Sequence, residues 1–162
     1  MLIINVNYCG WKNKQYSNII PVWKFIFLTF ITSGIYEIVW FYNNWKFFKK
    51  KDNLNISPFW RAIFAIFFIH SLLKIILKLT KKEGYKESFS AGWLTFFWIA
   101  ISILWRLPDP YWLISFFTFL MLLPPLQAMN YYWKKKQPNL PMKPFNWWLI
   151  ILTILAVVWW TL

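Results

Sequence analysis

Apolar stretches of about 20 residues, separated by short basic segments, make up most of this sequence. Hydrophobic residues account for 59% of the 162 positions, whereas soluble domains average about 45–50%. A soluble fold of this size would expose large apolar patches, but a helix of roughly 20 such residues crosses the ~30 Å hydrocarbon core of a bilayer. The sequence therefore predicts an all-α integral membrane helical bundle.

The basic residues lie mainly between the apolar stretches. The chain has 18 Lys and Arg but only 5 Asp and Glu. In a soluble protein this excess would indicate nucleic-acid binding. Lysines that flank apolar stretches are instead typical of cytoplasmic loops, and they attract anionic headgroups. We therefore expect the lipid bilayer, and anionic lipids in particular, as the partner, and no nucleic acid.

The positions of glycine, proline and lysine divide the chain into a short tail and a series of expected helices. Residues 1–18 are expected to form a loose polar tail, and residues 19–162 a single helical membrane domain. Four or five hydrophobic helices are expected there, over about 20–48, 58–79, 92–107, 111–133 and 145–162. Gly34, next to Ser33, is expected to bend the first of them, and Pro124-Pro125 the fourth, because Gly/Ser pairs and prolines are common causes of sharp kinks.

Two segments repeat one pattern. Residues 53–59 (NLNISPF) and 139–145 (NLPMKPF) share Asn-Leu, a Met or Ile, and Pro-Phe at the same spacing. Each follows an aromatic helix end that carries several lysines. We interpret this as an internal repeat within the chain.

The repeat leaves two topologies open. If the segment 58–79 lies in the interface or re-enters, both copies share the cytoplasm, together with 14 of the 18 basic residues. His70, Lys74 and Lys78 lie on one face of this segment, as in interfacial helices, and the positive-inside rule favours this arrangement. If instead all five helices span, the copies become inverted repeats, which are common in transporters.

One motif combines a glycine with regularly spaced aromatic residues and is followed by a basic run. It consists of Thr32, Gly34, Ile35, Tyr36, Trp40, Tyr42 and Trp45. With the later Pro58-x-x-Arg61 and Pro125-Leu126-x-x-x-Asn130, it resembles a family of small bacterial inner-membrane proteins classed as a domain of unknown function. The resemblance covers most of the chain in layout. It implies a multi-pass protein of the bacterial inner (cytoplasmic) membrane and no activity. The residue types themselves predict a bend, then an aromatic packing face and an interfacial anchor.

Polar groups within the apolar stretches are the candidates for a functional site. Glu37 is the only acid in such a stretch, and an intramembrane ionisable group is a functional candidate whose partner should be named. We expect Arg61 or Lys74 as that partner, and the alternative is a solvated or purely structural carboxylate. The candidate intramembrane polar residues are Glu37, Arg61, His70, Lys74, Gln127 and Asn130.

No catalytic motif is present in the sequence. One His, one Cys and five acids on separate segments do not supply the three or four ligands of a zinc site. A phosphate-binding glycine loop and a Ser-His-Asp set are also missing. We expect no catalytic residues, no cofactor, no metal and no enzymatic activity.

Two functions are compatible with these features. The first is a non-enzymatic membrane protein whose basic cytoplasmic face binds anionic lipid or a partner protein, unless the lysines only set the topology. The contact residues would be Lys46, Lys49, Lys50, Lys51, Lys74, Lys78, Lys81, Lys82, Lys134, Lys135 and Lys136. The second is a small transporter or channel subunit, a homo-oligomer built from inverted repeats. Its path would be lined by Glu37, Arg61, His70, Gln127 and Asn130.

Overall fold

The computed structural model describes residues 16–108, 111–143, 151 and 158. The structure is 74% helix, which confirms the all-α class. Over the described ranges the only β pairing is an isolated bridge between Ser17 and Met142. The helix expected over 145–162 lies outside the described residues except for positions 151 and 158.

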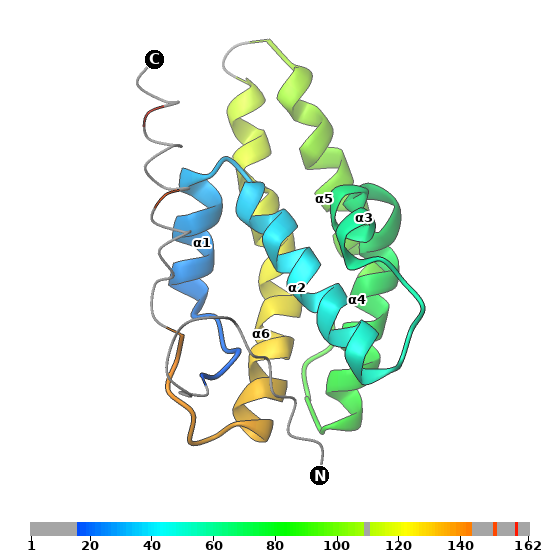
Figure 1. Cartoon of the computed structure of the whole chain (residues 1–162). Helices are drawn as coiled ribbons and strands as arrows, with labels where there is room; N and C mark the ends of the chain where they lie inside the picture. The colour runs from blue at the N-terminus through cyan, green and yellow to red at the C-terminus, as the bar shows by residue number, and fades with distance from the viewer. Residues whose placement is uncertain (1–15, 109–110, 144–150, 152–157, 159–162) are drawn as a thin grey trace.

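Gly34 divides the first expected helix into two. Helix α1 covers Val22–Ile31, and α2 covers Ile35–Lys51 (Figure 1). Gly34 has a φ of 88° at the start of α2, a left-handed conformation that glycine adopts without steric cost. Thr32 supports this turn, because its hydroxyl donates to the Leu28 carbonyl (2.7 Å) and accepts from the Tyr36 amide (3.0 Å). The helix expected over 20–48 is therefore two helices that meet at the expected bend.

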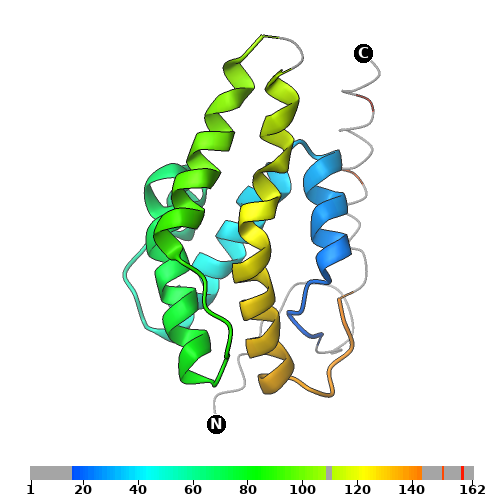
Figure 2. The same cartoon turned by 180° about the vertical axis from the view of Figure 1, so that it is seen from behind.

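The segment expected as one helix over 58–79 is also two elements. Helix α3 covers Pro58–Ile63, with proline in the first turn where no backbone donor is needed, and α4 covers Ala65–Lys82. The chain leaves the end of α2, reaches α3 at mid-height of the bundle, and descends again along α4 (Figures 1 and 2). The segment thus turns back within the bundle and does not run from one end to the other.

The remaining two expected helices have 3₁₀ extensions. Helix α5 covers Ala91–Ile103 and continues as the 3₁₀ turn η1, Leu104–Arg106. The 3₁₀ helix η2, Tyr111–Thr118, leads into α6, Phe119–Lys136. The expected kink at Pro124-Pro125 does not divide α6, which continues through both prolines. The combined segment Leu113–Lys136 is long and apolar enough to cross a membrane, while α1 and α5 are apolar but shorter.

Aromatic side chains of α1 and α2 form the centre of the core. The Phe25 ring lies 5.8 Å from the Tyr36 ring and 5.9 Å from the Trp40 ring, both in edge-to-face geometry. Apolar faces of α4 and α6 complete the core, for example with Ile76 and Leu126. Other large apolar side chains lie on the outside of the bundle, and Phe67 is 76% exposed.

Helices α2, α4 and α6 all end at the same end of the bundle, the lower end in Figure 1. We call it the basic end, because the last turn of each of these helices is basic: Lys49, Lys50 and Lys51 in α2, Lys81 and Lys82 in α4, and Lys134, Lys135 and Lys136 in α6. The two repeat copies both begin just after such a lysine-rich helix end.

The last residues of the expected loose tail are bonded to the basic end. The Ser17 amide donates to the Pro141 carbonyl (2.8 Å), and the Asn18 amide donates to Gln137 Oε1 (3.2 Å). The expectation of a loose tail is therefore wrong for residues 17 and 18, because the segment after α6 offers acceptors for their backbone. Residues 1–15 lie outside the described part of the chain.

Candidate functional site

Glu37 is a buried carboxylate held by two hydrogen bonds. Its side chain is 3% exposed, and its oxygens accept from Trp98 Nε1 (2.9 Å) and from the Thr118 hydroxyl (2.8 Å). Trp98 belongs to α5 and Thr118 to η2, so this carboxylate joins three elements of the bundle. Among the described residues no ion pair joins a basic side chain to Glu37, whose side-chain partners are Trp98 and Thr118.

Arg61 and Lys74 were expected as partners of Glu37, and this expectation is wrong. The Arg61 guanidinium instead lies against aromatic rings, 4.6 Å from the Trp45 centroid and 5.0 Å from the Phe68 centroid. Such cation–π contacts are favourable where the cation is partly removed from water. Lys74 is exposed on the outer face of α4.

The other candidate polar residues also lie apart from Glu37. Asn130 clamps the backbone before α1, since its side-chain amide donates to the Ile20 carbonyl (2.7 Å) and accepts from the Ile20 amide (2.9 Å). Gln127 is exposed and His70 is half-buried. Across the described residues no hydrogen bond or ion pair joins any two of the six candidates, so they do not form one polar site.

The residues of the motif build the turn and the core. Thr32 and Gly34 form the break between α1 and α2, as described above. Tyr36, Trp40 and Trp45 are buried, with exposed fractions of 7%, 2% and 1%. Ile35 is 51% exposed. Tyr42 is half-buried, and the ammonium of Lys46 lies 5.7 Å from its ring centroid.

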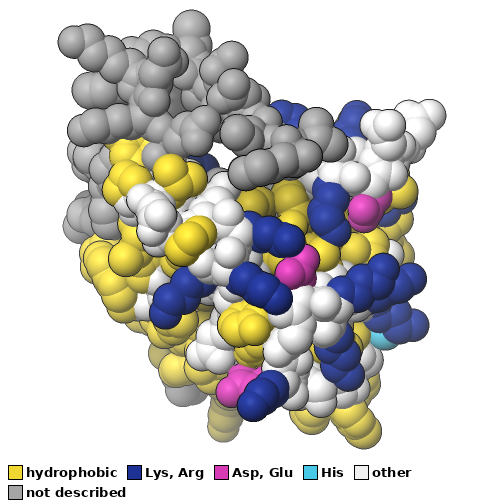
Figure 3. All heavy atoms as spheres, turned by 90° about the horizontal axis from the view of Figure 1, so that it is seen from below, with side chains coloured by type: hydrophobic (Ala, Val, Ile, Leu, Met, Phe, Trp, Pro, Cys, Tyr) yellow, Lys and Arg dark blue, Asp and Glu magenta, His cyan; other side chains and the backbone are white. Residues whose placement is uncertain are grey.

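Most of the lysines expected to contact anionic lipid lie on one surface, the basic end. Viewed from below, Lys and Arg side chains spread over this end with a few acidic groups among them (Figure 3). Lys49, Lys50, Lys81, Lys82 and Lys134 are exposed. Lys51 is also exposed, and its ammonium lies 6.0 Å from the ring centroid of Tyr132 in α6.

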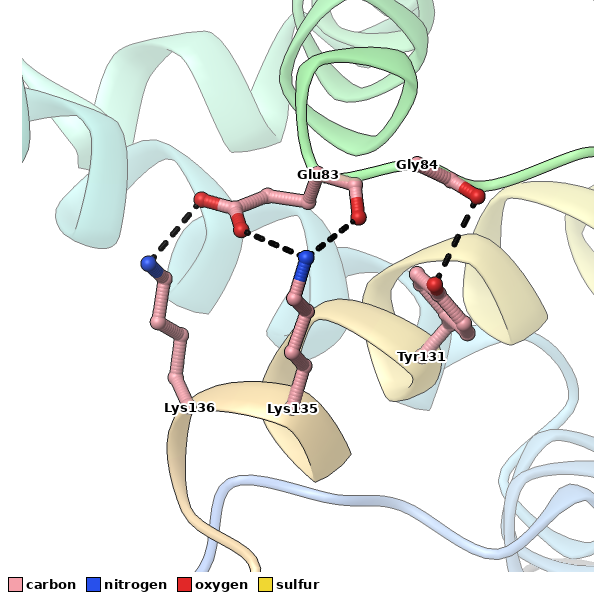
Figure 4. Close-up of polar contacts among 5 residues, drawn as sticks. All are labelled: Glu83, Gly84, Tyr131, Lys135 and Lys136. Atoms are coloured by element: carbon pink, nitrogen blue, oxygen red, sulfur yellow. Dashed lines mark hydrogen bonds and ion pairs between the residues drawn. The ribbon is translucent and has the colours of Figure 1, made fainter.

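Glu83 ties the loop after α4 to the end of α6. Its carboxylate pairs with Lys136 Nζ (3.0 Å) and Lys135 Nζ (3.4 Å), and Lys135 also donates to the Glu83 carbonyl (2.7 Å) (Figure 4). Next to it, Gly84 has a φ of 90° and accepts from the Tyr131 hydroxyl (3.4 Å). The ammonium groups, Lys136 first, hold the pKa of the Glu83 carboxyl below its usual range.

The contact between Glu83 and α6 is expected to loosen in acid. A carboxyl whose pKa is lower in the folded state stabilises the structure above its unfolded pKa, and this contribution is lost as pH falls through the folded pKa. Hydrogen exchange of residues 83–90 should therefore stay constant from pH 7 to 5, after correction for intrinsic rates, and accelerate below about pH 4. Glu83→Gln should show the faster exchange already at pH 7. An unchanged rate in that variant would contradict the prediction.

Sequence reasoning missed Trp98, Thr118 and Glu83. The first two were read as part of apolar stretches, and no local pattern assigns them to an acid in another helix. Glu83 carried a usable signal, since it is an acid between lysines and directly before Gly84, a residue type that favours helix C-termini. Among the described residues, no three His, Cys, Asp or Glu side chains lie together where they could hold a metal ion.

The comparisons with known proteins found no relative of this chain. No family model, curated protein or solved structure matches the chain. The resemblance to the bacterial inner-membrane family therefore stays a prediction from the motif.

Proposed function

We propose that this chain is a multi-pass protein of the bacterial cytoplasmic membrane whose basic end binds anionic lipid headgroups on the cytoplasmic side, without enzymatic activity. The observation that carries the proposal is the position of the three lysine-rich helix ends of α2, α4 and α6 on one surface. Each lysine near an anionic membrane surface contributes about 1 kcal/mol to binding, so several lysines on one surface add up to a strong attraction.

Exposed apolar residues support contact with lipid. Trp23 and Trp93 are each 64% exposed, and Phe96 is 61% exposed. On a soluble protein such surface would cause aggregation or mark an interface. In a bilayer the same side chains lie against acyl chains or at the membrane–water boundary, where Trp is enriched.

The exposed side chains between the α3–α4 turn, at mid-height of the bundle, and the end of α4 support a membrane boundary on the way to the basic end. Trp60 and Phe64 stack at a centroid distance of 5.9 Å, and both are more than 40% exposed. Further along α4 the exposed residues change to Lys74 and Lys78. A change from exposed aromatic to exposed basic side chains toward the basic end is the pattern expected across a membrane–water boundary.

The alternative, a transporter built from inverted repeats, receives no support from this arrangement. It requires the two repeat copies at opposite ends of the bundle. Helices α2 and α6, which precede the two copies, end at the same end. We therefore propose lipid binding and leave transport aside.

Anionic lipid is expected to stabilise the purified full-length protein in a salt-dependent manner. Lipid at 100 times its dissociation constant adds about 2.7 kcal/mol. For a chain of this size this corresponds to a rise of about 5–10 °C in the unfolding midpoint. The measurement is thermal unfolding in mild detergent with phosphatidylglycerol or phosphatidylcholine of the same acyl chains, at low salt and at about 0.5 M NaCl.

The triple variant Lys49→Gln, Lys50→Gln, Lys134→Gln should lose at least half of the rise. These three side chains are exposed, so their replacement leaves the core intact. An equal rise with phosphatidylcholine, or a rise that persists at high salt, would rule out headgroup binding by the basic end.

A further inference from the structure

A shallow hollow lies beside the ion pairs of Glu83. It is lined by Tyr131, Lys134 and Lys135 at the end of α6. Lys134 is exposed and makes no hydrogen bond or ion pair within the part of the chain that is described. The Tyr131 hydroxyl has only a long contact, 3.4 Å, with the Gly84 carbonyl. The hollow therefore offers one donor, Lys134, with no partner in the described part of the chain. Its two other donors are shared, the Tyr131 hydroxyl with the Gly84 carbonyl over a long distance and Lys135 with Glu83.

Glu83 places an anionic group next to this hollow. Its carboxylate oxygens lie 3.0 Å from Lys136 Nζ and 3.4 Å from Lys135 Nζ (Figure 4). A phosphate group has the same requirement for charge-assisted hydrogen bonds from lysine. The lysines are about half exposed, with side-chain values of 52% for Lys135 and 49% for Lys136. Exposed ion pairs of this kind are weak, so an incoming phosphate can replace the carboxylate.

We propose that the phosphate group of an anionic lipid binds in the hollow between Tyr131, Lys134 and Lys135, and that Glu83 is an internal competitor for Lys135 and Lys136. This inference rests on the proposed function and assigns its binding site. It also gives the site a regulatory element, because the lipid phosphate and the Glu83 carboxylate compete for the ammonium groups of Lys135 and Lys136.

Two loop carboxylates allow a matched test of competition. Glu87 lies in the same loop and is exposed, and its carboxylate accepts from the Tyr85 hydroxyl (2.9 Å) and not from the lysines of α6. Glu83→Gln and Glu87→Gln therefore remove the same charge, but only Glu83→Gln removes a carboxylate that is paired with Lys135 and Lys136. The bond from Lys135 to the Glu83 backbone carbonyl is kept in both variants. Glu83→Asp keeps the charge while withdrawing the carboxylate by one methylene group.

The experiment measures the apparent Kd of the full-length protein in detergent for a fluorescently labelled phosphatidylglycerol. Glu83→Gln is expected to tighten binding about 3- to 10-fold, Glu83→Asp by less, and Glu87→Gln by less than twofold. Adding Lys135→Gln to Glu83→Gln should abolish the gain. Equal effects of Glu83→Gln and Glu87→Gln, or no effect of either, would overturn the competition.

Two further measurements distinguish a failure of the proposed function from a failure of the binding-site assignment. If wild-type protein does not prefer phosphatidylglycerol over phosphatidylcholine at low salt, the proposed function itself fails. If that preference holds but Glu83→Gln matches Glu87→Gln, only the assignment of this site fails. Inorganic phosphate at millimolar concentration should displace little labelled lipid. Full displacement would show that the hollow takes a soluble anion and would overturn the lipid as its ligand.

Discussion

Replacing Trp45 by alanine is expected to lower the free energy of unfolding by about 3–5 kcal/mol, the range for truncation of a buried Trp. Trp45 is 1% exposed, and its ring supports the Arg61 guanidinium at 4.6 Å. The substitution therefore leaves a cavity and also removes one of the two rings that hold Arg61. Because Arg61 lies in α3, the attachment of α3 to α2 should weaken together with the core.

The measurement is unfolding by sodium dodecyl sulfate in mixed micelles, followed by circular dichroism. Trp60→Ala is the matched control, since Trp60 is 57% exposed and lies in α3 itself. Its loss should cost less than about 1 kcal/mol, as is usual for surface positions. If both variants lost the same amount, the buried position of Trp45 against Arg61 would be contradicted.

Replacing Glu37 by leucine is expected to lower the free energy of unfolding by about 2–4 kcal/mol, although leucine has a similar volume and suits an apolar site. The Trp98 N–H and the Thr118 hydroxyl would lose their acceptor, and a buried donor without a partner costs about 1–3 kcal/mol. Glu37→Gln should stay within about 1 kcal/mol of wild type. Its amide oxygen accepts from Trp98, and its amide nitrogen donates to the Thr118 hydroxyl.

The comparison of these two variants, in the same unfolding assay, tests what Glu37 contributes. A large cost for leucine and a small cost for glutamine would show that Glu37 acts as a hydrogen-bond acceptor between helices. A glutamine variant as unstable as the leucine variant would mean that the negative charge is needed, and the hydrogen-bonding account of Glu37 would be wrong.

The fold was partly predictable because some signals are local. The break between α1 and α2 follows from Gly34, whose positive φ is accessible to glycine. The break at Phe64 carries no such signal, since neither glycine nor proline lies there. At this break the Arg61 guanidinium lies against the Trp45 ring of α2 and against the Phe68 ring of α4. Contacts between helices depend on the tertiary arrangement, and the spacing of apolar residues in the sequence does not predict it.

The candidate site was less predictable for the same reason. The hydrogen-bond partners of Glu37 lie 61 and 81 residues away in the chain. A buried acid is usually paired with a base, so sequence reasoning assigned Arg61 and Lys74 to it. Helical spacing identifies which residues share a face, but it does not say which face of another helix they meet. The basic end was easier to predict, because its lysines follow directly from the ends of the apolar stretches.

The common end of α2, α4 and α6 has a further electrostatic consequence. Each α-helix carries about half a negative charge at its C-terminus, from carbonyl groups without a helical partner. Three such C-termini lie together here, so their partial charges add, while the lysines of the last turns neutralise them. The net positive potential of this surface is therefore smaller than its lysine count suggests. Removing these lysines would expose the carbonyl ends of three helices to an anionic membrane, and the surface would change from attraction toward repulsion.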